Sequence, residues 1–367
     1  MLYLYVFITV ILINCAYLFL FLRFALSKSL NTTNKQNTLP VSVLVYVKNN
    51  AQHLENNLNA IIEQDYPNFE LILINDDSSD ESLEILEAFQ LKYANFPILL
   101  SNVYGNETFW GSKKYALTLG IKRAKNEYLL FTDANCKPTS NQWIQEMAAG
   151  FQNNEHVVLG YSNYKKQKGF FNLILRFDTL LNAVHYLSFA YAKMTYMGVG
   201  KNLAYTSNVY YENRGFISHV KLPVGDDDLF VNEVATKKNT SLVWNKEAHI
   251  EIEPLKKWED WLELRKNRAW TFRRYKTKHK VILGIYFLSS FLFWLGTIGA
   301  FFFLDWKIAT GLIIFRLLLQ YFSMGILAKK LNAKRLIIHL PWLELALMFL
   351  QLRTAIYYIT KPANNWR

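Results

Sequence analysis

The stretch Tyr128-Leu-Leu-Phe-Thr-Asp-Ala-Asn-Cys-Lys-Pro138 joins a predicted strand to a pair of oxygen-bearing side chains. Its apolar first half predicts a short buried strand, and Pro138 prevents that strand from continuing. In an open α/β sheet, ligands bind just beyond the carboxyl ends of the strands, where Asp133 and Asn135 fall. Side-chain oxygens two residues apart can share a hard divalent cation such as Mg²⁺ or Mn²⁺. A simple turn is the alternative, because Asp and Asn are common where strands end.

Upstream of this stretch, apolar strand patterns alternate with helical patterns. Buried strands are expected at 41–47, 69–74, 97–102 and 127–132. Helices are expected at 53–64, from about 81 with Ser79 or Asp80 as the N-cap, and at 110–125. Downstream, the sequence predicts a strand at 157–160 and a helix at 170–193. The alternation predicts an α/β fold with a mostly parallel sheet and right-handed crossovers.

The amino-terminal segment is apolar enough to enter a membrane. Residues 1–22 are almost wholly apolar and have about the length needed to cross a bilayer. Arg23 and Lys28 follow, which predicts that this end faces the cytoplasm. A cleaved signal peptide is the alternative, but no positive charge precedes the run and no small-residue cleavage site follows it. We therefore expect an uncleaved anchor.

Three further apolar segments lie near the carboxyl terminus. Residues 281–304 carry no charge and are long enough to span, and 308–327 returns with Arg316 inside it. A charge at that position needs a partner or a buried face. A proline and two charges interrupt 336–359, so spanning, re-entrant and interfacial placements all stay open. The expected organisation is an anchor at 1–23, a linker at 24–40, a catalytic domain at 41–277, a membrane region at 278–360 and a basic tail at 361–367.

Composition narrows the possible partners. The chain has a formal net charge of +12, which predicts an anionic partner. Much of the positive charge lies beside the apolar segments, and no nucleic-acid-binding motif accompanies it. We therefore expect anionic membrane lipid and a phosphorylated substrate as partners, and no nucleic acid.

Several motifs between residues 41 and 133 occur in a set order. They are Val41-Ser-Val, Asn49-Asn50, Gln64-Asp-Tyr-Pro67, Glu70-Leu-Ile-Leu-Ile-Asn-Asp76, Gly111-Ser-Lys113-Lys-Tyr-Ala-Leu117 and Asp133-Ala-Asn135. Together they closely resemble the family 2 glycosyltransferases of the GT-A fold, over about residues 41–275. In that family an Asp-x-Asp motif holds a metal where this chain has Asp133-Ala-Asn135. The resemblance implies a GT-A (Rossmann-like, mostly parallel) catalytic domain, here flanked by transmembrane helices at both ends.

The resemblance implies a nucleotide-sugar donor, with UDP as the nucleotide that is usual in the family. It places the base and ribose near the end of the first strand and Asp76, and it brings Lys113 to the diphosphate. From the residues alone, the acidic loop after the second strand could simply cap the next helix, and Lys113 could be an exposed helix lysine. The donor-binding positions implied are Val45, Asn49, Asp76, Ser78, Asp80, Lys113, Asp133 and Arg268.

The implied cofactor is a divalent cation, Mn²⁺ or Mg²⁺, held by Asp133 with help from Asn135. A neutral amide oxygen binds such a cation less strongly than a carboxylate does. The departure from Asp-x-Asp at Asn135 therefore predicts weak metal affinity.

A second acidic group occurs at Gly225-Asp-Asp-Asp228. Adjacent carboxylates raise one another's pKa unless a cation or proton intervenes, so one of them is a candidate general base. The alternative is an acidic helix N-terminus favoured by the helix dipole. The family places its catalytic aspartate three positions before a leucine, which gives Asp226 when counted from Leu229. Matching the Gly-Asp-Asp letters gives Asp227 instead, and we favour Asp226 by spacing.

Two further motifs carry the resemblance past residue 195. Met197-Gly-Val-Gly-Lys-Asn-Leu-Ala-Tyr205 is similar to the stretch bordering the acceptor site in the family, although Gly-x-Gly also serves any tight turn. Arg265-Lys-Asn-Arg268-Ala-Trp270 is similar to the Gln-x-x-Arg-Trp motif of processive synthases, with a glutamine replaced and a tryptophan displaced. These departures imply transfer of one sugar per acceptor. Arg268 would bind the diphosphate, or belong to a basic cluster that meets anionic lipid. The implied acceptor-side residues are Gly198, Gly200, Asn202 and Trp270.

The combined expectation is an inverting, non-processive glycosyltransferase. It would sit in the bacterial inner membrane with its catalytic domain in the cytoplasm, and it would use a lipid-linked or saccharide acceptor. The alternative is a degenerate, non-catalytic module that binds sugar nucleotide or polymer and partners another membrane enzyme. The altered metal and Gln-x-x-Arg-Trp motifs favour that alternative, and the acidic group at 225–228 argues against it.

Overall fold

The structure is a computed structural model that describes residues 1–28, 38–104, 113–152 and 155–360, with the backbone alone at 354–360. Part of the expected linker, the Gly111-Ser112 pair and the whole basic tail at 361–367 lie outside the described residues. The chain divides into two compact units. The helical unit comprises Met1–Ser27, Gly169–Ser188 and Lys256–Arg367, and the sheet unit comprises Lys28–Lys168 and Phe189–Leu255.

The sheet unit is built on a seven-stranded sheet in the order β3-β2-β1-β4-β8-β6-β9. Its strands are β1 (Val41–Val47), β2 (Phe69–Asp76), β3 (Ile98–Val103), β4 (Tyr128–Asp133), β6 (Val157–Leu159), β8 (Leu203–Thr206) and β9 (Thr240–Leu242). The first four are mutually parallel, and β8 runs antiparallel to both β4 and β6. The predicted mostly parallel α/β sheet is therefore confirmed.

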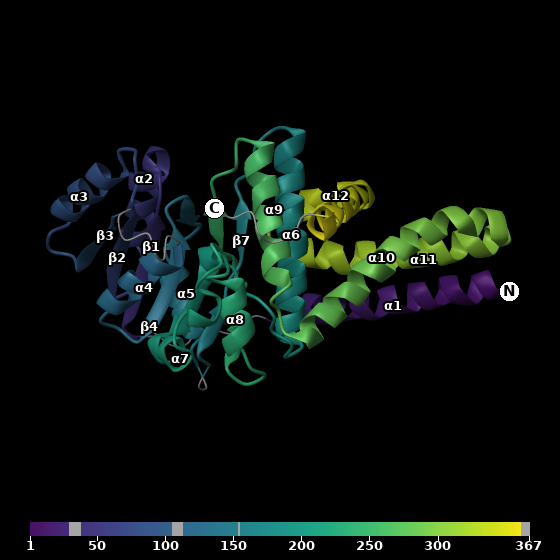
Figure 1. Cartoon of the computed structure of the whole chain (residues 1–367), viewed down its shortest axis with the longest axis horizontal. Helices are drawn as coiled ribbons and strands as arrows, with labels where there is room; N and C mark the ends of the chain where they lie inside the picture. The colour runs from purple at the N-terminus through teal and green to yellow at the C-terminus, as the bar shows by residue number, and fades with distance from the viewer. Residues whose placement is uncertain (29–37, 105–112, 153–154, 361–367) are drawn as a thin grey trace. The chain divides into compact units, whose positions relative to one another are not determined.

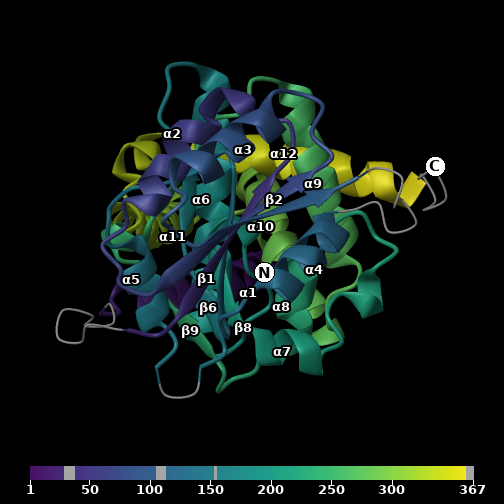
Figure 2. The same ribbon diagram turned by 90° about the vertical axis from the view of Figure 1, so that its left-hand side faces the viewer.

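Helices cover both faces of the parallel half of the sheet. They are α2 (Ala51–Ile62), α3 (Ser82–Lys92) and α4 (Lys113–Arg123). The steps from β1 to β2 to β3 move one way along the sheet and the step to β4 moves back, so right-handed crossovers place α4 opposite the other two helices. Figure 2 shows α2 and α3 on one side of β1 and β2, and α4 on the other. This double coverage explains why β1 and β2 are continuous apolar runs, with Leu44 and Ile72 fully buried.

Shorter elements complete the sheet unit. A second sheet pairs β5 (Cys136–Pro138), β10 (Ile250–Ile252) and β7 (Ser162–Tyr164), in the order β5-β10-β7. The remaining helices of this unit are α5 (Trp143–Ala149), α7 (Ser207–Glu212), α8 (Asp228–Val234) and the 3₁₀ turns η2 (Gly200–Asn202), η3 (Ile217–His219) and η4 (Lys246–Ala248). Strand β4 ends at Asp133, and Pro138 is the last residue of a separate edge strand, β5, a position that tolerates proline because one side of β5 needs no backbone donor.

The N-cap predicted for the helix that begins at about residue 81 is wrong. Helix α3 has Glu81 at its N-cap, without a side-chain capping bond. Asp80 instead accepts hydrogen bonds from the backbone N–H groups of Ala51 and Ser82. It therefore ties together the starts of α2 and α3.

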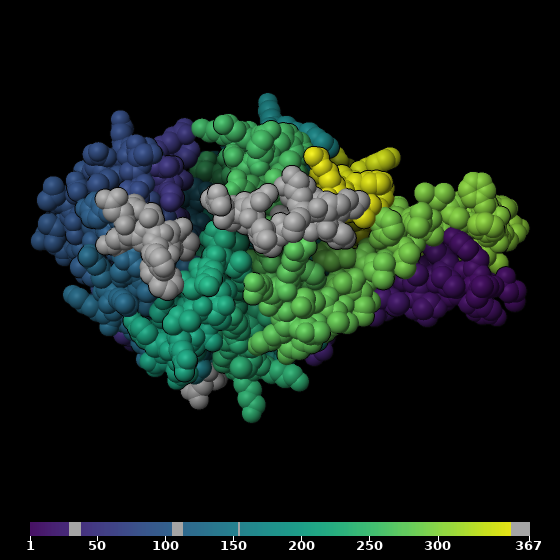
Figure 3. All heavy atoms as spheres, viewed as in Figure 1, coloured from purple at the N-terminus to yellow at the C-terminus, as the bar shows by residue number. Residues whose placement is uncertain are grey.

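The helical unit contains long apolar helices. They are α1 (Leu2–Ala25), α10 (Thr277–Phe303), α11 (Trp306–Lys330) and, after the 3₁₀ turn η5 (Lys334–His339), α12 (Leu340–Thr360), with α9 (Trp258–Phe272) and most of α6 (Phe170–Tyr191) packed in the same unit. Four segments, Leu2–Ala25, Thr277–Phe303, Trp306–Lys330 and Lys334–Arg353, are long and apolar enough to cross a membrane. Tyr3 and Tyr17 of α1 donate hydrogen bonds to backbone carbonyls of α10. Figure 3 shows the surfaces of α1 and the α10–α11 pair in contact.

The charge expected within the third apolar segment has its partner. Arg316 is 2% exposed, and its Nη2 lies 3.2 Å from Glu344 Oε1 and 3.1 Å from Asn14 Oδ1. Gln320 accepts a further bond from the same guanidinium. This network links α1, α11 and α12, so the prediction that Arg316 needs a partner and a buried face is confirmed.

Helix α12 runs across α1, α10 and α11 instead of alongside them, as Figures 1 and 2 show together. The spanning, re-entrant and interfacial placements of 336–359 stay predictions.

Candidate active site

The candidate site lies at the carboxyl edge of the parallel strands. Because β1, β2 and β4 are parallel and in register, their ends meet at one edge. Val45 pairs with Thr132 of β4, and Tyr46 pairs with Asp133. Asp76 ends the neighbouring strand β2. The fold therefore brings together the strand-end residues that the sequence singled out.

The end of the site nearest β2 is organised around Asp76. This carboxylate is 8% exposed and accepts hydrogen bonds from Tyr46 Oη at 2.5 Å and Lys48 Nζ at 3.1 Å. Beside it, Asn49 Oδ1 accepts from the backbone N–H of Ser79 at 2.8 Å, and Ser78 Oγ accepts from the N–H of Asn49 at 3.2 Å. The loops after β1 and β2 are thus tied to each other.

Of the donor-side residues expected here, Asn49, Ser78 and Asp80 act in these loop contacts. Val45 is 1% exposed and packs within the sheet. Asp76 is the one whose carboxylate stands at the strand end beside polar side chains. The direct contacts of all five with a donor stay predictions.

Tyr46 is a site residue that the sequence did not single out. Its hydroxyl bonds Asp76, and the ammonium of Lys113 lies 4.6 Å from the centre of its ring. Tyr46 therefore connects the two ends of the site. The parallel pairing of β1 with β4 predicts this position, because Tyr46 pairs with Asp133 and both residues therefore lie at the same edge of the sheet.

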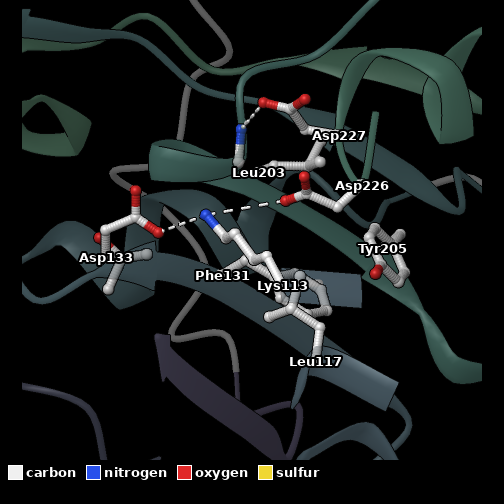
Figure 4. A pocket seen from close by; sticks show the side chains of 10 residues that line it. Lys113, Leu117, Phe131, Asp133, Leu203, Tyr205, Asp226 and Asp227 are labelled. Carbon is white, nitrogen blue, oxygen red and sulfur yellow. Dashed lines mark hydrogen bonds and ion pairs between the residues drawn. The ribbon is translucent and has the colours of Figure 1, made fainter. Parts of the chain in front are cut away.

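Asp133 is held between two lysines. Its Oδ1 lies 2.6 Å from Lys113 Nζ, and its Oδ2 lies 2.6 Å from Lys201 Nζ. Lys201 Nζ is also 3.3 Å from Asn135 Oδ1. Figure 4 shows Lys113 between Asp133 and Asp226. The site thus concentrates positive charge at the end of β4.

Lys201 is the second residue that the sequence did not single out, and strand pairing explains its position. Phe131 of β4 pairs with Leu203 of β8 in an antiparallel ladder. Continuing that register by two residues places Lys201 opposite Asp133. Thr132 Oγ1 donates a hydrogen bond to the Lys201 carbonyl at 3.0 Å, which fixes the backbone there.

The charges of this cluster are mutually stabilised. Burial alone would lower the pKa of Lys113 and Lys201, but the Asp133 carboxylate outweighs burial and raises both above the usual lysine range. Burial likewise would raise the pKa of Asp133, and the two ammonium groups lower it instead. All three groups are therefore ionised at neutral pH.

This donor set does not fit a divalent cation. Both carboxylate oxygens of Asp133 are paired with ammonium groups, and the side-chain oxygen of Asn135 faces Lys201. Within the described part of the chain, no group of three His, Cys, Asp or Glu side chains could hold a metal. The metal role that the resemblance implies for Asp133 and Asn135 stays a prediction.

The acidic group at 225–228 borders the same pocket. Gly225 has φ +101°, and a Cβ there would come within 2.5 Å of the Leu229 side chain, so the turn requires glycine. Asp227 accepts from the backbone N–H of Asp228 at 2.6 Å and from that of Gly200 at 2.8 Å. Both its oxygens therefore bind backbone, and it caps α8 as the helix N-terminus interpretation expects. Both Asp226 and Asp227 line the pocket, and Asp226 Oδ2 lies 3.7 Å from Lys113 Nζ.

The neighbouring carboxylates affect Asp227. Burial, followed by the charges of Asp226 and Asp228, raises the pKa of Asp227 to about 7. Asp227 therefore titrates near neutral pH. Its protonation weakens an acceptor that holds the loop at Gly200.

Lys114 is a third residue that the sequence analysis did not separate from its neighbour. It is 1% exposed, and its Nζ donates to the carbonyls of His219, Leu222 and Val224 at 2.8, 2.7 and 2.6 Å. Successive helix residues point about 100° apart, so Lys113 can face the pocket while Lys114 enters the protein. Burial lowers the pKa of Lys114 to about 8. Lys114 holds the segment that leads into Gly225.

Of the expected acceptor-side residues, Gly200 lines the pocket. Gly198 is buried, with Leu203 and Val231 around its α-carbon. Asn202 is fully buried and accepts a hydrogen bond from Trp143 Nε1 at 2.9 Å. Gly198 and Asn202 therefore support the pocket wall from behind.

The last two expected residues, Arg268 and Trp270, belong to the helical unit. There Arg268 Nη1 lies 3.3 Å from Asp178 Oδ2, and Arg265 pairs with the same carboxylate. Arg273 lies over the ring of Trp270, at 5.9 Å. The roles of Arg268 and Trp270 toward donor and acceptor stay predictions.

A mostly parallel sheet with acidic and basic side chains at its carboxyl edge defines an α/β domain of the GT-A class. Residues 42–205 match the family model described as Glycosyl transferase family 2. Residues 42–205 of the chain are therefore similar to the family 2 glycosyltransferases.

Individual proteins agree with that assignment. The glycosyltransferase GlyG of Streptococcus pneumoniae is 32% identical over 138 residues, covering 36% of this chain and 42% of GlyG. The glycosyltransferase AglE of Haloferax volcanii is 32% identical over 111 residues, covering 29% of this chain and 34% of AglE. The chain thus spans less than half the length of these curated relatives.

The mannosyltransferase PcManGT of Pyrobaculum calidifontis, solved in complex with GDP-Man and Mn²⁺, shares the fold. Its TM-score is 0.59 at 15% identity, with coverage of 91% of this chain and 94% of that one. This likeness confirms the GT-A architecture of the sheet unit.

Proposed function

We propose that this protein transfers one sugar from a nucleotide-sugar donor to an acceptor hydroxyl, with inversion at the anomeric carbon. The observation that carries the proposal is a pocket in which Lys113 lies between Asp133 and Asp226. A cation for a leaving diphosphate and a carboxylate for an incoming hydroxyl line the same pocket.

The donor would lie along the carboxyl edge of the sheet. Asp76, oriented by Tyr46, suits the hydroxyl or N–H groups of a ribose or base. Lys113 suits the diphosphate. The UDP-linked class is proposed from the resemblance, and the GDP-Man complex of the Pyrobaculum mannosyltransferase keeps GDP in the panel to be tested.

The chemistry assigns one task to each group. The acceptor oxygen attacks the anomeric carbon from the face opposite the diphosphate, and the bond from that carbon to the diphosphate oxygen breaks. The proton of the acceptor hydroxyl passes to Asp226, whose carboxylate is not engaged by the backbone as Asp227 is. The lysine charge stabilises the leaving diphosphate, and the transition state has oxocarbenium character.

The family resemblance implies a Mn²⁺ or Mg²⁺ ion at Asp133. Because both oxygens of Asp133 are paired with lysines, no step of this mechanism is routed through a metal.

The proposed location is the cytoplasmic face of the bacterial inner membrane, with a lipid-linked or saccharide acceptor and anionic lipid as partners. The apolar helices and the net charge of +12 support it. Arg265 supports the transfer of a single sugar, because it occupies the position of the glutamine in the motif of processive synthases. Its side chain is 9% exposed and pairs with Asp178.

A binding module without turnover is the second candidate, favoured by the occupied carboxylate of Asp133. The test is nucleoside-diphosphate release by the full chain in lipid nanodiscs, across UDP-, GDP- and dTDP-sugars, with and without membrane lipid extract. Release from one donor that increases with extract supports the transferase. Tight donor binding without release in any mixture supports the module instead.

A further inference from the structure

The ammonium of Lys201 lies between the two side chains that should hold the metal. Its Nζ is 2.6 Å from Asp133 Oδ2 and 3.3 Å from Asn135 Oδ1. These are the oxygens that the Asp-x-Asp resemblance assigns to a divalent cation. A lysine ammonium is a compact charge with three donors, so it can bind both oxygens and still present a donor to a further anion.

The fold fixes the backbone of Lys201. It belongs to η2, directly before β8, and its carbonyl is held by Thr132 of β4. Its side chain is 23% exposed and that of Asp133 is 15% exposed. Charges that are partly buried interact more strongly than exposed ones, so the pair is persistent.

The charges add up as they would with a metal. Lys113 and Lys201 supply two positive charges to Asp133, the formal charge of one divalent cation. Counted with the Asp226 carboxylate, which lies 3.7 Å from Lys113 Nζ, the two lysines and Asp133 are neutral overall, whereas a second carboxylate in place of Asn135 would leave the site at −1 and repel a diphosphate. A divalent cation could bind Asp133 only by displacing the ammonium of Lys113 or Lys201 from a carboxylate oxygen. Both ammonium groups would stay close to the cation and repel it.

We infer that Lys201, together with Lys113, takes the place of the divalent cation and binds the leaving diphosphate, so that this protein uses its donor without metal. The inference rests on the proposed function and specifies how the same site neutralises charge. It also explains the neutral residue at Asn135: a second carboxylate there would cancel the charge that Lys201 supplies.

Binding to the full chain in nanodiscs tests the inference, with UDP, GDP and dTDP and their monophosphates as probes, in EDTA and in Mn²⁺. The diphosphate of the preferred nucleoside should bind in EDTA with a Kd within about threefold of its value in Mn²⁺. Lys201→Met should weaken diphosphate binding by about 10- to 100-fold, the worth of a charge-assisted contact, and monophosphate binding by less. Lys122→Met, an exposed lysine on the same helix as Lys113, should change neither.

A complementary variant distinguishes charge replacement from a structural role of Lys201. Lys201→Met combined with Asn135→Asp restores an Asp-x-Asp pair and removes one competing ammonium. This double variant should bind diphosphate poorly in EDTA and recover by about tenfold or more in Mn²⁺. A Lys201 that only supports the fold would give no such metal response.

The outcomes separate the inference from the proposed function. Diphosphate binding by the unaltered chain that is lost in EDTA and restored by Mn²⁺ overturns the inference and leaves the transferase standing. Equal diphosphate binding by the Lys201→Met variant also overturns it. Failure of every nucleotide to bind in either medium contradicts the proposed function itself.

Discussion

Replacing Lys114 tests whether this buried lysine holds the acidic loop at 225–228 in position. Lys114 Nζ donates to three carbonyls between His219 and Val224, directly before Gly225. Lys114→Met keeps the length of the side chain and removes the three bonds. At about 1 kcal/mol net for each bond, the loss is about 3 kcal/mol, shared between stability and loop order.

The assay pairs thermal unfolding in nanodiscs with the rate of nucleoside-diphosphate release. Lys114→Met should lower the midpoint of unfolding and reduce kcat by at least about tenfold, because the Asp226 carboxylate loses its fixed position. The Kd for nucleoside diphosphate should change little, since Lys113 and Lys201 are untouched. Lys114→Arg keeps charge and donors and should retain more activity than Lys114→Met. Full activity and stability in Lys114→Met would refute this reasoning.

Three further predictions follow from other contacts. Activity should rise with pH through about 7, because the raised pKa leaves Asp227 protonated below that value; Asp227→Asn should remove this step from the pH–rate profile, and an unchanged profile would show that another group titrates. Tyr46→Phe removes the hydroxyl that bonds Asp76 and should weaken nucleoside mono- and diphosphate equally, by about fivefold for a bond of about 1 kcal/mol, as measured by titration; a loss confined to diphosphate would contradict the placement of the nucleoside. Breaking the buried pair with Arg316→Met or Glu344→Met should cost about 3–5 kcal/mol, whereas the double variant should unfold at a temperature closer to that of the unaltered chain; additive losses in the double variant would mean that the pair is not coupled.

The parallel half of the fold follows from local sequence. β1, β2 and β4 are continuous apolar runs because helices cover both of their faces, and runs of that kind are recognisable without the structure. Since parallel strands share one carboxyl edge, the proximity of Asp76 and Asp133 followed as well. Bringing these two carboxylates to one edge therefore needed only strand order, whereas their role toward a donor was implied by the family resemblance.

Lys201 could not be assigned from its neighbours in sequence. Its meeting with Asp133 depends on the antiparallel pairing of β8, a strand of four residues, with β4. Strands that short leave little periodicity, and tertiary contacts decide them. Within Gly200-Lys201-Asn202, the glycine indicates a tight turn, and no local pattern marks Lys201 as a partner of Asp133.

The choice between Asp226 and Asp227 also depended on a non-local contact. Spacing from Leu229 favoured Asp226, and the backbone N–H of Gly200 supplies a physical reason, because it engages Asp227 from a different segment. No pattern within 225–228 encodes that bond.

The sequence predicted that Arg316 has a partner, but it did not predict which residue. The partner, Glu344, lies on a different helix, so identifying it required the packing of α11 and α12.

The central claim is tested most directly by the initial rate of nucleoside-diphosphate release with the preferred donor and lipid extract, for the unaltered chain, Asp226→Asn and the exposed control Glu87→Gln. Removing a general base costs about 10²- to 10⁴-fold, so Asp226→Asn should lose at least a hundredfold in kcat while its Kd for the nucleotide stays within about twofold. Glu87→Gln should match the unaltered chain. A rate for Asp226→Asn within tenfold of the unaltered chain would contradict the assignment of this pocket as the transfer site with Asp226 as its base.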